Sequence, residues 1–193
     1  MIHSHLECPF FSMPTRQLLN SILDLLMSSK RLLLLLALIP VMLLSFGLYL
    51  QHGLGLEPCP MCIVQRYVML TMLLWALLFA FIPSPGAKPW GLGAYTVLSF
   101  LGAYVAARQS WLQWYPPEVV SCGRDFYGMI ETFPLKRAIP MIFKGGGDCS
   151  AVDWTFLGGS IANWSFVAFV MLGLLVLFLL IRITAAIISS TLR

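Results

Sequence analysis

Four long apolar stretches dominate the pattern of this chain. They cover residues 32–50, 63–82, 91–107 and 164–183, and shorter stretches with polar residues, glycine or proline separate them. Each holds 17 to 20 residues, which is the range that crosses the roughly 30 Å hydrocarbon core of a bilayer as a helix. The pattern therefore predicts an all-α membrane protein with a bundle of four transmembrane helices.

The apolar stretches also divide the chain. We expect three parts, which are an N-terminal extension (1–29), one four-helix membrane domain (30–183) and a C-terminal tail (184–193). Within the domain, residues 51–62 and 108–163 form two loops on the same side of the membrane. Met27 begins a plausible chain of its own directly before the first span, so we expect the extension to be dispensable.

The composition agrees with a membrane protein. Hydrophobic residues make up 59% of the chain and charged residues 10%, whereas about 25% of the residues of a soluble domain are charged. The formal net charge is +4, and much of it lies beside the apolar stretches. We interpret these charges as a signal for membrane topology, and they do not indicate that the protein binds nucleic acid.

Both termini are expected in the cytoplasm. Four spans place the termini on one side, and Lys30 and Arg31 lie directly before the first span, which usually determines the orientation. Cysteine pairs that faced the cytosol would be kept reduced. Four of the five cysteines lie in the two loops on the other side, at positions 59, 62, 122 and 149.

The motif Cys59-Pro-Met-Cys62 lies at the start of the second span. Its spacing is typical of a redox-active dithiol or of half a zinc site. We expect Cys62 to open the helix, whose N-terminus favours a thiolate. A purely structural disulfide is the alternative, but a bridge that closes so small a loop stabilises a fold poorly. The pattern therefore favours redox chemistry.

Cys122 and Cys149 form the second group of cysteines. They can close the long loop as a structural disulfide, or they can exchange electrons with the first pair, because thiol–disulfide exchange needs a donor pair and an acceptor pair that meet. The glycine run 145–147 gives Cys149 a flexible connection. A zinc site of all four cysteines is disfavoured because the second pair lacks the usual close spacing, and we expect no metal.

A disulfide that oxidises other thiols must itself be regenerated. The chain has no Gly-x-Gly-x-x-Gly turn before a helix for a flavin or nicotinamide cofactor. The apolar surroundings of Cys62 instead indicate a lipid-soluble acceptor, a quinone. Arg66 lies one helical turn after Cys62 on the same face, where it can bind the acceptor or extend to lipid phosphate. Gln65 can add an amide hydrogen bond.

At this point the residues resemble a known family. A four-span chain with Cys-x-x-Cys-x-x-x-Arg at its second span is similar to the disulfide bond formation protein B (DsbB) family, whose link to quinone in the bacterial periplasm is well known. The resemblance covers residues 30–182. Its further support comes from Trp111-Leu112-Gln113, Pro116-Pro117, Pro134-Leu135, Phe143, Gly147-Asp148-Cys149, Trp154 and Phe156-Leu157-Gly158.

The resemblance implies an enzyme of the bacterial inner membrane with two periplasmic loops. It implies the disulfides Cys59–Cys62 and Cys122–Cys149. The second pair takes electrons from a reduced periplasmic oxidase of the DsbA type, which has a thioredoxin fold, and the first pair receives them. Cys62 then reacts with ubiquinone or menaquinone. The enzyme would thereby reoxidise its partner and support disulfide bond formation.

The resemblance also concerns two residues beside the quinone. Arg66 is expected to assist the reaction at Cys62. Gln109 stands where members of the family often have a histidine near the quinone, so the chain departs from the family pattern at this contact.

Two other interpretations compete with this one. The vitamin K epoxide reductase-like family also couples a four-helix membrane fold to a quinone, but its Cys-x-x-Cys follows the loop pair, whereas here it precedes that pair. A non-catalytic membrane scaffold with two structural disulfides is the second alternative. Structural bridges would resist a glutathione buffer, whereas exchangeable ones would not.

Overall fold

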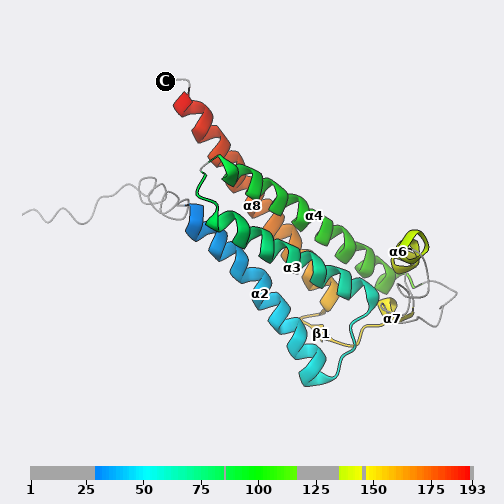
Figure 1. Ribbon diagram of the computed structural model, residues 1–193. Helices are drawn as coiled ribbons and strands as arrows, with labels where there is room; N and C mark the ends of the chain where they lie inside the picture. The colour runs from blue at the N-terminus through cyan, green and yellow to red at the C-terminus, as the bar shows by residue number, and fades with distance from the viewer. Residues whose placement is uncertain (1–28, 85, 117–134, 145–146, 192–193) are drawn as a thin grey trace, which may run out of the picture.

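Four long helices form the body of the protein (Figure 1). The computed structural model describes residues 29–84, 86–116, 135–144 and 147–191. The long helices are α2 (Ser29–Leu54), α3 (Pro60–Phe81), α4 (Ala87–Trp114) and α8 (Ile161–Thr191). Each contains a segment that is long and apolar enough to cross a membrane, so the predicted fold class, an all-α bundle of four transmembrane helices, is confirmed.

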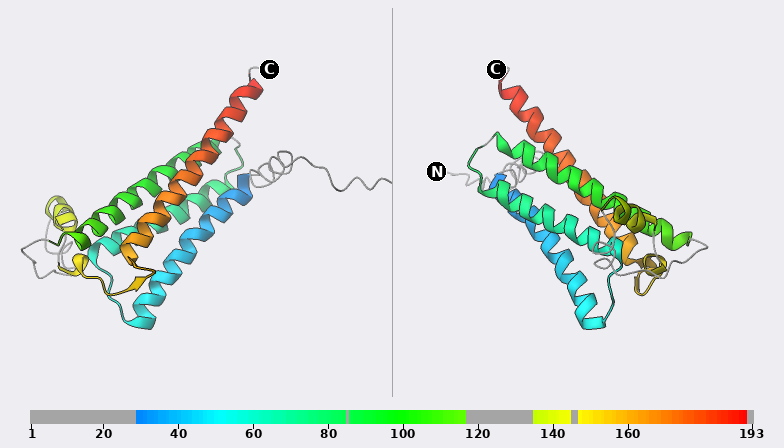
Figure 2. Two further views of the ribbon diagram at one scale, coloured as in Figure 1. Left: turned by 180° about the vertical axis from the view of Figure 1, so that it is seen from behind. Right: turned by 45° about the vertical axis from the view of Figure 1, so that its right-hand side comes forward.

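Each long helix packs mainly against one or two of the others. α3 lies between α2 and α4, and α8 packs along α4. Seen from behind, α8 runs in front of the bundle, between α4 and α2 (Figure 2). The start of α2 and the end of α8 lie at one end of the bundle. The short elements gather at the other end, and they are α6 (Leu135–Lys144), α7 (Gly147–Ser150), β1 (Thr155–Phe156) and β2 (Gly159–Ser160).

The interior of the bundle is apolar and closely packed. Its central side chains include Leu33, Met72, Tyr95 and Phe169. The Tyr95 hydroxyl donates a hydrogen bond to a carbonyl of α2, at 2.9 Å. Leucine and phenylalanine side chains also cover much of the outer surface, and such a surface suits lipid as the surrounding solvent.

A glycine allows α4 and α8 to pack closely. A Cβ atom placed on Gly102 would lie 2.4 Å from the ring of Phe169. The absence of a side chain at this position therefore lets the phenylalanine ring fill the space between the two helices, as small residues do in membrane bundles.

The helices extend beyond the apolar stretches that predicted them. α2 continues through residues 51–54 and ends where Gly55 takes a left-handed conformation, with φ of 69°. α4 continues to Trp114, so Gln109 lies on a helix and not in a loop. α8 begins at Ile161 and includes most of the predicted tail. Apolar stretches locate the lipid-facing part of a helix, whereas glycine, proline and caps determine where the helix ends.

A small hairpin precedes α8. Thr155 pairs with Ser160 and Phe156 with Gly159 in antiparallel register. The two turn residues, Leu157 and Gly158, both have positive φ, of 49° and 79°, which is the conformation that tight two-residue hairpins require. The sequence predicts no strand here, because two residues per strand are too few to produce an alternating pattern.

Candidate active site

Cys59 forms the N-terminal cap of α3. Its backbone is extended, its carbonyl accepts the first helical hydrogen bond from Ile63, and its sulfur accepts the backbone N–H of Cys62 at 3.4 Å. Pro60 occupies the first helical position, where its missing N–H costs nothing. The helix therefore begins at Pro60, and Cys62 lies within its first turn, still close to the positive end of the helix dipole.

The sulfurs of Cys59 and Cys62 lie 3.0 Å apart, and Cys59 donates to Cys62. The two sulfurs of a disulfide lie about 2.05 Å apart, so both cysteines are free thiols in this structure. Cys59 is buried, whereas Cys62 is half-buried. The pair is thus close enough to form a disulfide without a change in the helix.

Cys149 lies against Cys59. It sits on α7, is 1% exposed, and belongs to the same buried cluster as Cys59, Met61 and Ile142. A hydrogen bond to Cys149, another to Cys62 and burial together raise the pKa of the Cys59 thiol above its ordinary value. Cys59 therefore keeps its proton more firmly than an exposed thiol, and it has two cysteine neighbours.

Two glutamines approach the cysteines from neighbouring helices. The Gln109 amide nitrogen donates to the sulfurs of Cys59 and Cys62, at 3.2 Å each. The Gln65 amide nitrogen donates to the oxygen of Gln109 at 2.8 Å. Each glutamine is only 4% exposed. The structure thus brings both predicted glutamines to the site, with Gln109 on the sulfurs themselves.

Arg66 is fixed by α2. One terminal nitrogen donates to the side-chain oxygen of Gln51, and the other donates to the carbonyl of Gly47 at 3.0 Å. Arg66 is half-buried. Sequence reasoning missed Gln51, whose only signal was a polar residue directly after the first apolar stretch.

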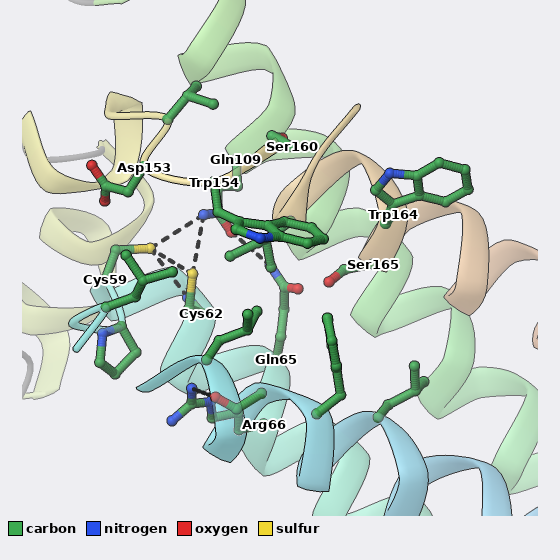
Figure 3. Close-up of a pocket in the computed structure, with 18 of the residues that line it drawn as sticks. Cys59, Cys62, Gln65, Arg66, Gln109, Asp153, Trp154, Ser160, Trp164 and Ser165 are labelled. Carbon is green, nitrogen blue, oxygen red and sulfur yellow. Dashed lines mark hydrogen bonds between the residues drawn. The ribbon is translucent and has the colours of Figure 1, made fainter. Parts of the chain in front are cut away.

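A cavity of about 280 Å³ lies beside these residues (Figure 3). Residues of α2 and the start of α8 form its apolar walls, and Trp154 closes one side, with its ring 5.9 Å from that of Phe46. Its polar lining includes the predicted residues Cys59, Cys62, Gln65, Arg66 and Gln109. These five residues, which span 51 positions of the sequence, therefore meet at one cavity.

Gln113 ties the segment after Cys149 to the bundle. Its amide nitrogen donates to the carbonyl of Ala151 at 3.4 Å, and its oxygen accepts from the Ser160 hydroxyl at 2.6 Å. Ser160 in turn accepts the backbone N–H of Asn163 at 3.3 Å. This network positions the hairpin above the cavity. In the sequence, only the family resemblance pointed to Gln113 and Trp154.

Two predicted features lie outside the described residues. They are Cys122, with its predicted disulfide to Cys149, and residues 145–146 of the glycine run. Residues 1–28 of the extension are outside them as well.

Comparison with known proteins assigns the chain to a family. The family description "Disulfide bond formation protein DsbB" matches residues 29–179. The chain belongs to this family. Three relatives, each named disulfide bond formation protein B, come from Polaromonas naphthalenivorans (64% identity, covering 83% of this chain and 96% of the relative), Paracidovorax citrulli (59%, covering 79% and 87%) and an Azoarcus species (53%, covering 72% and 84%).

Membership in the DsbB family settles the activity. The protein is a quinone-dependent thiol oxidoreductase that reoxidises DsbA and passes the electrons to quinones in disulfide bond formation. The match decides against both competing interpretations, the vitamin K epoxide reductase-like enzyme and the non-catalytic scaffold. The four candidate membrane helices agree with an inner-membrane protein.

Proposed function

We propose that electrons enter at Cys122, pass through Cys149 and Cys59, and leave at Cys62. In the resting enzyme the disulfides are Cys122–Cys149 and Cys59–Cys62. A thiolate of the reduced DsbA-type partner attacks Cys122 and releases Cys149 as a thiolate. Cys149 then attacks Cys59 and releases Cys62 as a thiolate, so each step exchanges one disulfide for another.

The second thiolate of the partner completes the transfer. It attacks the partner sulfur that is bound to Cys122 and releases Cys122, which then attacks Cys149 and releases Cys59. The partner leaves with its disulfide formed, and the Cys122–Cys149 disulfide is restored. Two electrons, with their protons, remain on Cys59 and Cys62.

The contact of Cys149 with Cys59 is the observation that carries this proposal. Cys59 has hydrogen bonds to both Cys149 and Cys62, so a sulfur able to attack and a sulfur able to leave are both neighbours of the one that is attacked. The raised pKa of the Cys59 thiol favours negative charge on Cys62 when the pair is reduced. Cys62 also lines the cavity and lies within the first turn of α3.

The cavity fits the ring of a quinone. Its volume of about 280 Å³ is close to the lower limit of about 300 Å³ for small-molecule sites, so it suits a ring and not a whole isoprenoid chain. Its walls are mostly apolar, and hydrogen-bond donors stand near Cys62. When bound, a quinone supplies the two-electron oxidant that converts the Cys59–Cys62 dithiol into a disulfide and takes up the electrons and protons as hydroquinone.

Arg66 is the residue that we assign to hold the ring carbonyl. A guanidinium has five N–H donors, and Gln51 and Gly47 accept from two of its nitrogens, so donors remain for a ligand in the cavity. Gln65 and Gln109 line the same cavity. Ubiquinone and menaquinone both present two ring carbonyls, so this donor set suits either, and measuring turnover with each distinguishes them.

The orientation follows from the same scheme. We propose that the cysteine-bearing end of the bundle faces the periplasm, where the DsbA-type partner resides, and that both termini face the cytoplasm. Lys30 at the start of α2 supports this orientation.

A trapping experiment tests the order of the relay. A partner that lacks its second cysteine is expected to remain linked to the enzyme as a mixed disulfide. Peptide mapping by mass spectrometry should identify the bridge at Cys122. A bridge mainly to Cys149 or Cys59 would reverse the proposed order.

A matched variant separates the two halves of the relay. Cys122→Ser should abolish the mixed disulfide but leave Cys59 and Cys62 oxidisable by added quinone. If the pair stays reduced in this variant despite excess quinone, the halves are not separable and the scheme fails.

A further inference from the structure

The direction of the Gln109 amide follows from its partners. A side-chain amide has donors on its nitrogen and acceptors on its oxygen. A thiolate or a disulfide sulfur can only accept, so only the nitrogen of Gln109 suits the oxidised pair or a Cys62 thiolate. The nitrogen lies 3.2 Å from both sulfurs, and the oxygen points away, toward Gln65.

Gln65 provides the donor that meets this oxygen. Its nitrogen lies 2.8 Å from the Gln109 oxygen, and both side chains are 4% exposed. At such burial an amide oxygen without a donor is costly. While the Gln65 nitrogen faces Gln109, the reversed orientation of Gln109 would place its oxygen against the sulfur acceptors and its N–H groups against those of Gln65.

We propose that Gln65 is a positioning residue, which fixes the Gln109 amide so that its N–H groups stabilise a Cys62 thiolate. Gln109 touches the reacting sulfurs, whereas Gln65 acts through Gln109. The assignment deepens the proposed function, since it rests on Cys62 being the sulfur that carries the negative charge. Gln109 would then stabilise the charge on the Cys62 sulfur as well as line the cavity.

The inference can be tested without quinone or partner protein. In the fully reduced protein, the rate of alkylation at Cys62 is followed against pH, with the modified peptide quantified by mass spectrometry. Only the thiolate reacts, so the midpoint of the profile reports how well the site stabilises it. Among the residues that the structure describes, the other titratable and charged groups around the sulfurs and the cavity are Cys149, Arg66, Glu57 and Asp153, and none of them is changed.

Replacing Gln109 removes the contact itself. Gln109→Met should move the midpoint upward by about one to two pH units, which is the size of a hydrogen bond to a charged group. Gln109→Asn keeps a polar head but withdraws it by one methylene, and it should move the midpoint in the same direction. An unchanged midpoint in both variants would overturn the role of Gln109.

The decisive comparison is between two replacements of Gln65. Gln65→Met removes the donor and should raise the midpoint by less than Gln109→Met does. Gln65→Glu has nearly the shape of glutamine, but once ionised it only accepts, so the Gln109 nitrogen turns toward it and the oxygen turns toward the sulfurs. Gln65→Glu should therefore raise the midpoint more than Gln65→Met does. It should also raise it more than Gln65→Glu does in a Gln109→Met background, where only the direct repulsion between the carboxylate and the thiolate remains.

A purely structural role, or the added charge alone, would not depend on Gln109. If Gln65→Glu shifts the midpoint by the same amount with Gln109 and in the Gln109→Met background, or if neither Gln65 variant moves it, the positioning role is wrong. Ser99→Ala serves as the matched control, because this buried polar residue of α4 bonds to the Tyr95 carbonyl and does not line the cavity. Its midpoint should equal that of the unmodified protein.

The test also distinguishes this inference from the relay. Alkylation of Cys62 requires neither Cys122 nor a quinone, so a failed relay leaves the measurement intact. Conversely, if the relay maps as proposed but the Gln65 variants behave as a structural role predicts, only the positioning inference is lost.

Discussion

Replacing Arg66 should separate quinone binding from thiol exchange. Arg66 enters the cavity already fixed by Gln51 and Gly47, so little side-chain entropy is lost when it binds a ligand. A hydrogen bond from a charged donor contributes about 1.5–3 kcal/mol, and each 1.4 kcal/mol is about tenfold in affinity. Arg66→Ala should therefore raise the KM for quinone by about 10- to 100-fold.

Arg66→Lys should restore only part of this loss. A lysine ammonium keeps the positive charge, but it lacks the planar fork that reaches Gln51, Gly47 and the cavity at once. We expect its KM for quinone to lie between those of Arg66→Ala and the unmodified protein.

Two assays distinguish the effects. Steady-state turnover with reduced partner at varied quinone concentration gives the KM. A single turnover without added quinone, in which the oxidised enzyme meets reduced partner, reports thiol–disulfide exchange among the cysteines without the quinone step and should be unchanged in Arg66→Ala. Arg182→Ala is the matched control, because this arginine lies beside the Phe178 ring on α8 and does not line the cavity.

The reasoning fails if Arg66→Ala leaves the dependence of rate on quinone concentration unchanged. It also fails if the single turnover slows as much as the steady state does, because Arg66 would then act on the cysteines and not on the ligand.

Three further predictions concern packing, the cavity and the start of the chain. Gly102→Ala should lower the thermal unfolding midpoint in detergent, by a destabilisation of about 1–3 kcal/mol, because a Cβ there would lie 2.4 Å from the Phe169 ring. Gly93→Ala, whose Cβ would find its nearest neighbour at 3.9 Å, should leave the midpoint near that of the unmodified protein, and equal effects would refute the packing argument. Trp154→Ala should raise the KM for quinone by about 2- to 10-fold, the value of an aromatic contact, and an unchanged KM would remove Trp154 from the site. A chain that starts at Met27 should insert and turn over normally, and loss of activity in membranes would show that the extension has a role.

The sequence predicted the parts of the site that are close together along one helix. The spacing from Cys59 to Cys62, and from Cys62 to Arg66, places Cys59 at the cap of α3 and the other two on its first turns. Helical periodicity converts such spacing directly into geometry. The fold class could also be predicted from the sequence, because apolar stretches of this length are typical of membrane helices.

The contacts between distant segments could not be predicted in this way. Gln65 and Gln109 are 44 residues apart, and their meeting depends on how α3 and α4 are rotated against each other. Gln51 reaches Arg66 because α2 continues past its apolar stretch. The pattern of apolar residues predicts neither how a helix is rotated about its axis nor how far it continues into polar residues. Both depend on how the helices pack.

The position of Cys59 at the helix cap explains how one sulfur can serve two partners. Its backbone is extended and lies outside the helical ladder, while Pro60 fixes the first helical residue directly after it. The Cys59 sulfur lies 3.0 Å from that of Cys62, and Cys149 packs against Cys59 in the same buried cluster. In the proposed relay, a change of disulfide partner at Cys59 then needs a side-chain rotation and no unwinding of α3. The Cys62 thiolate that this exchange releases forms within the first turn of the helix, where the dipole and the Gln109 amide favour its charge.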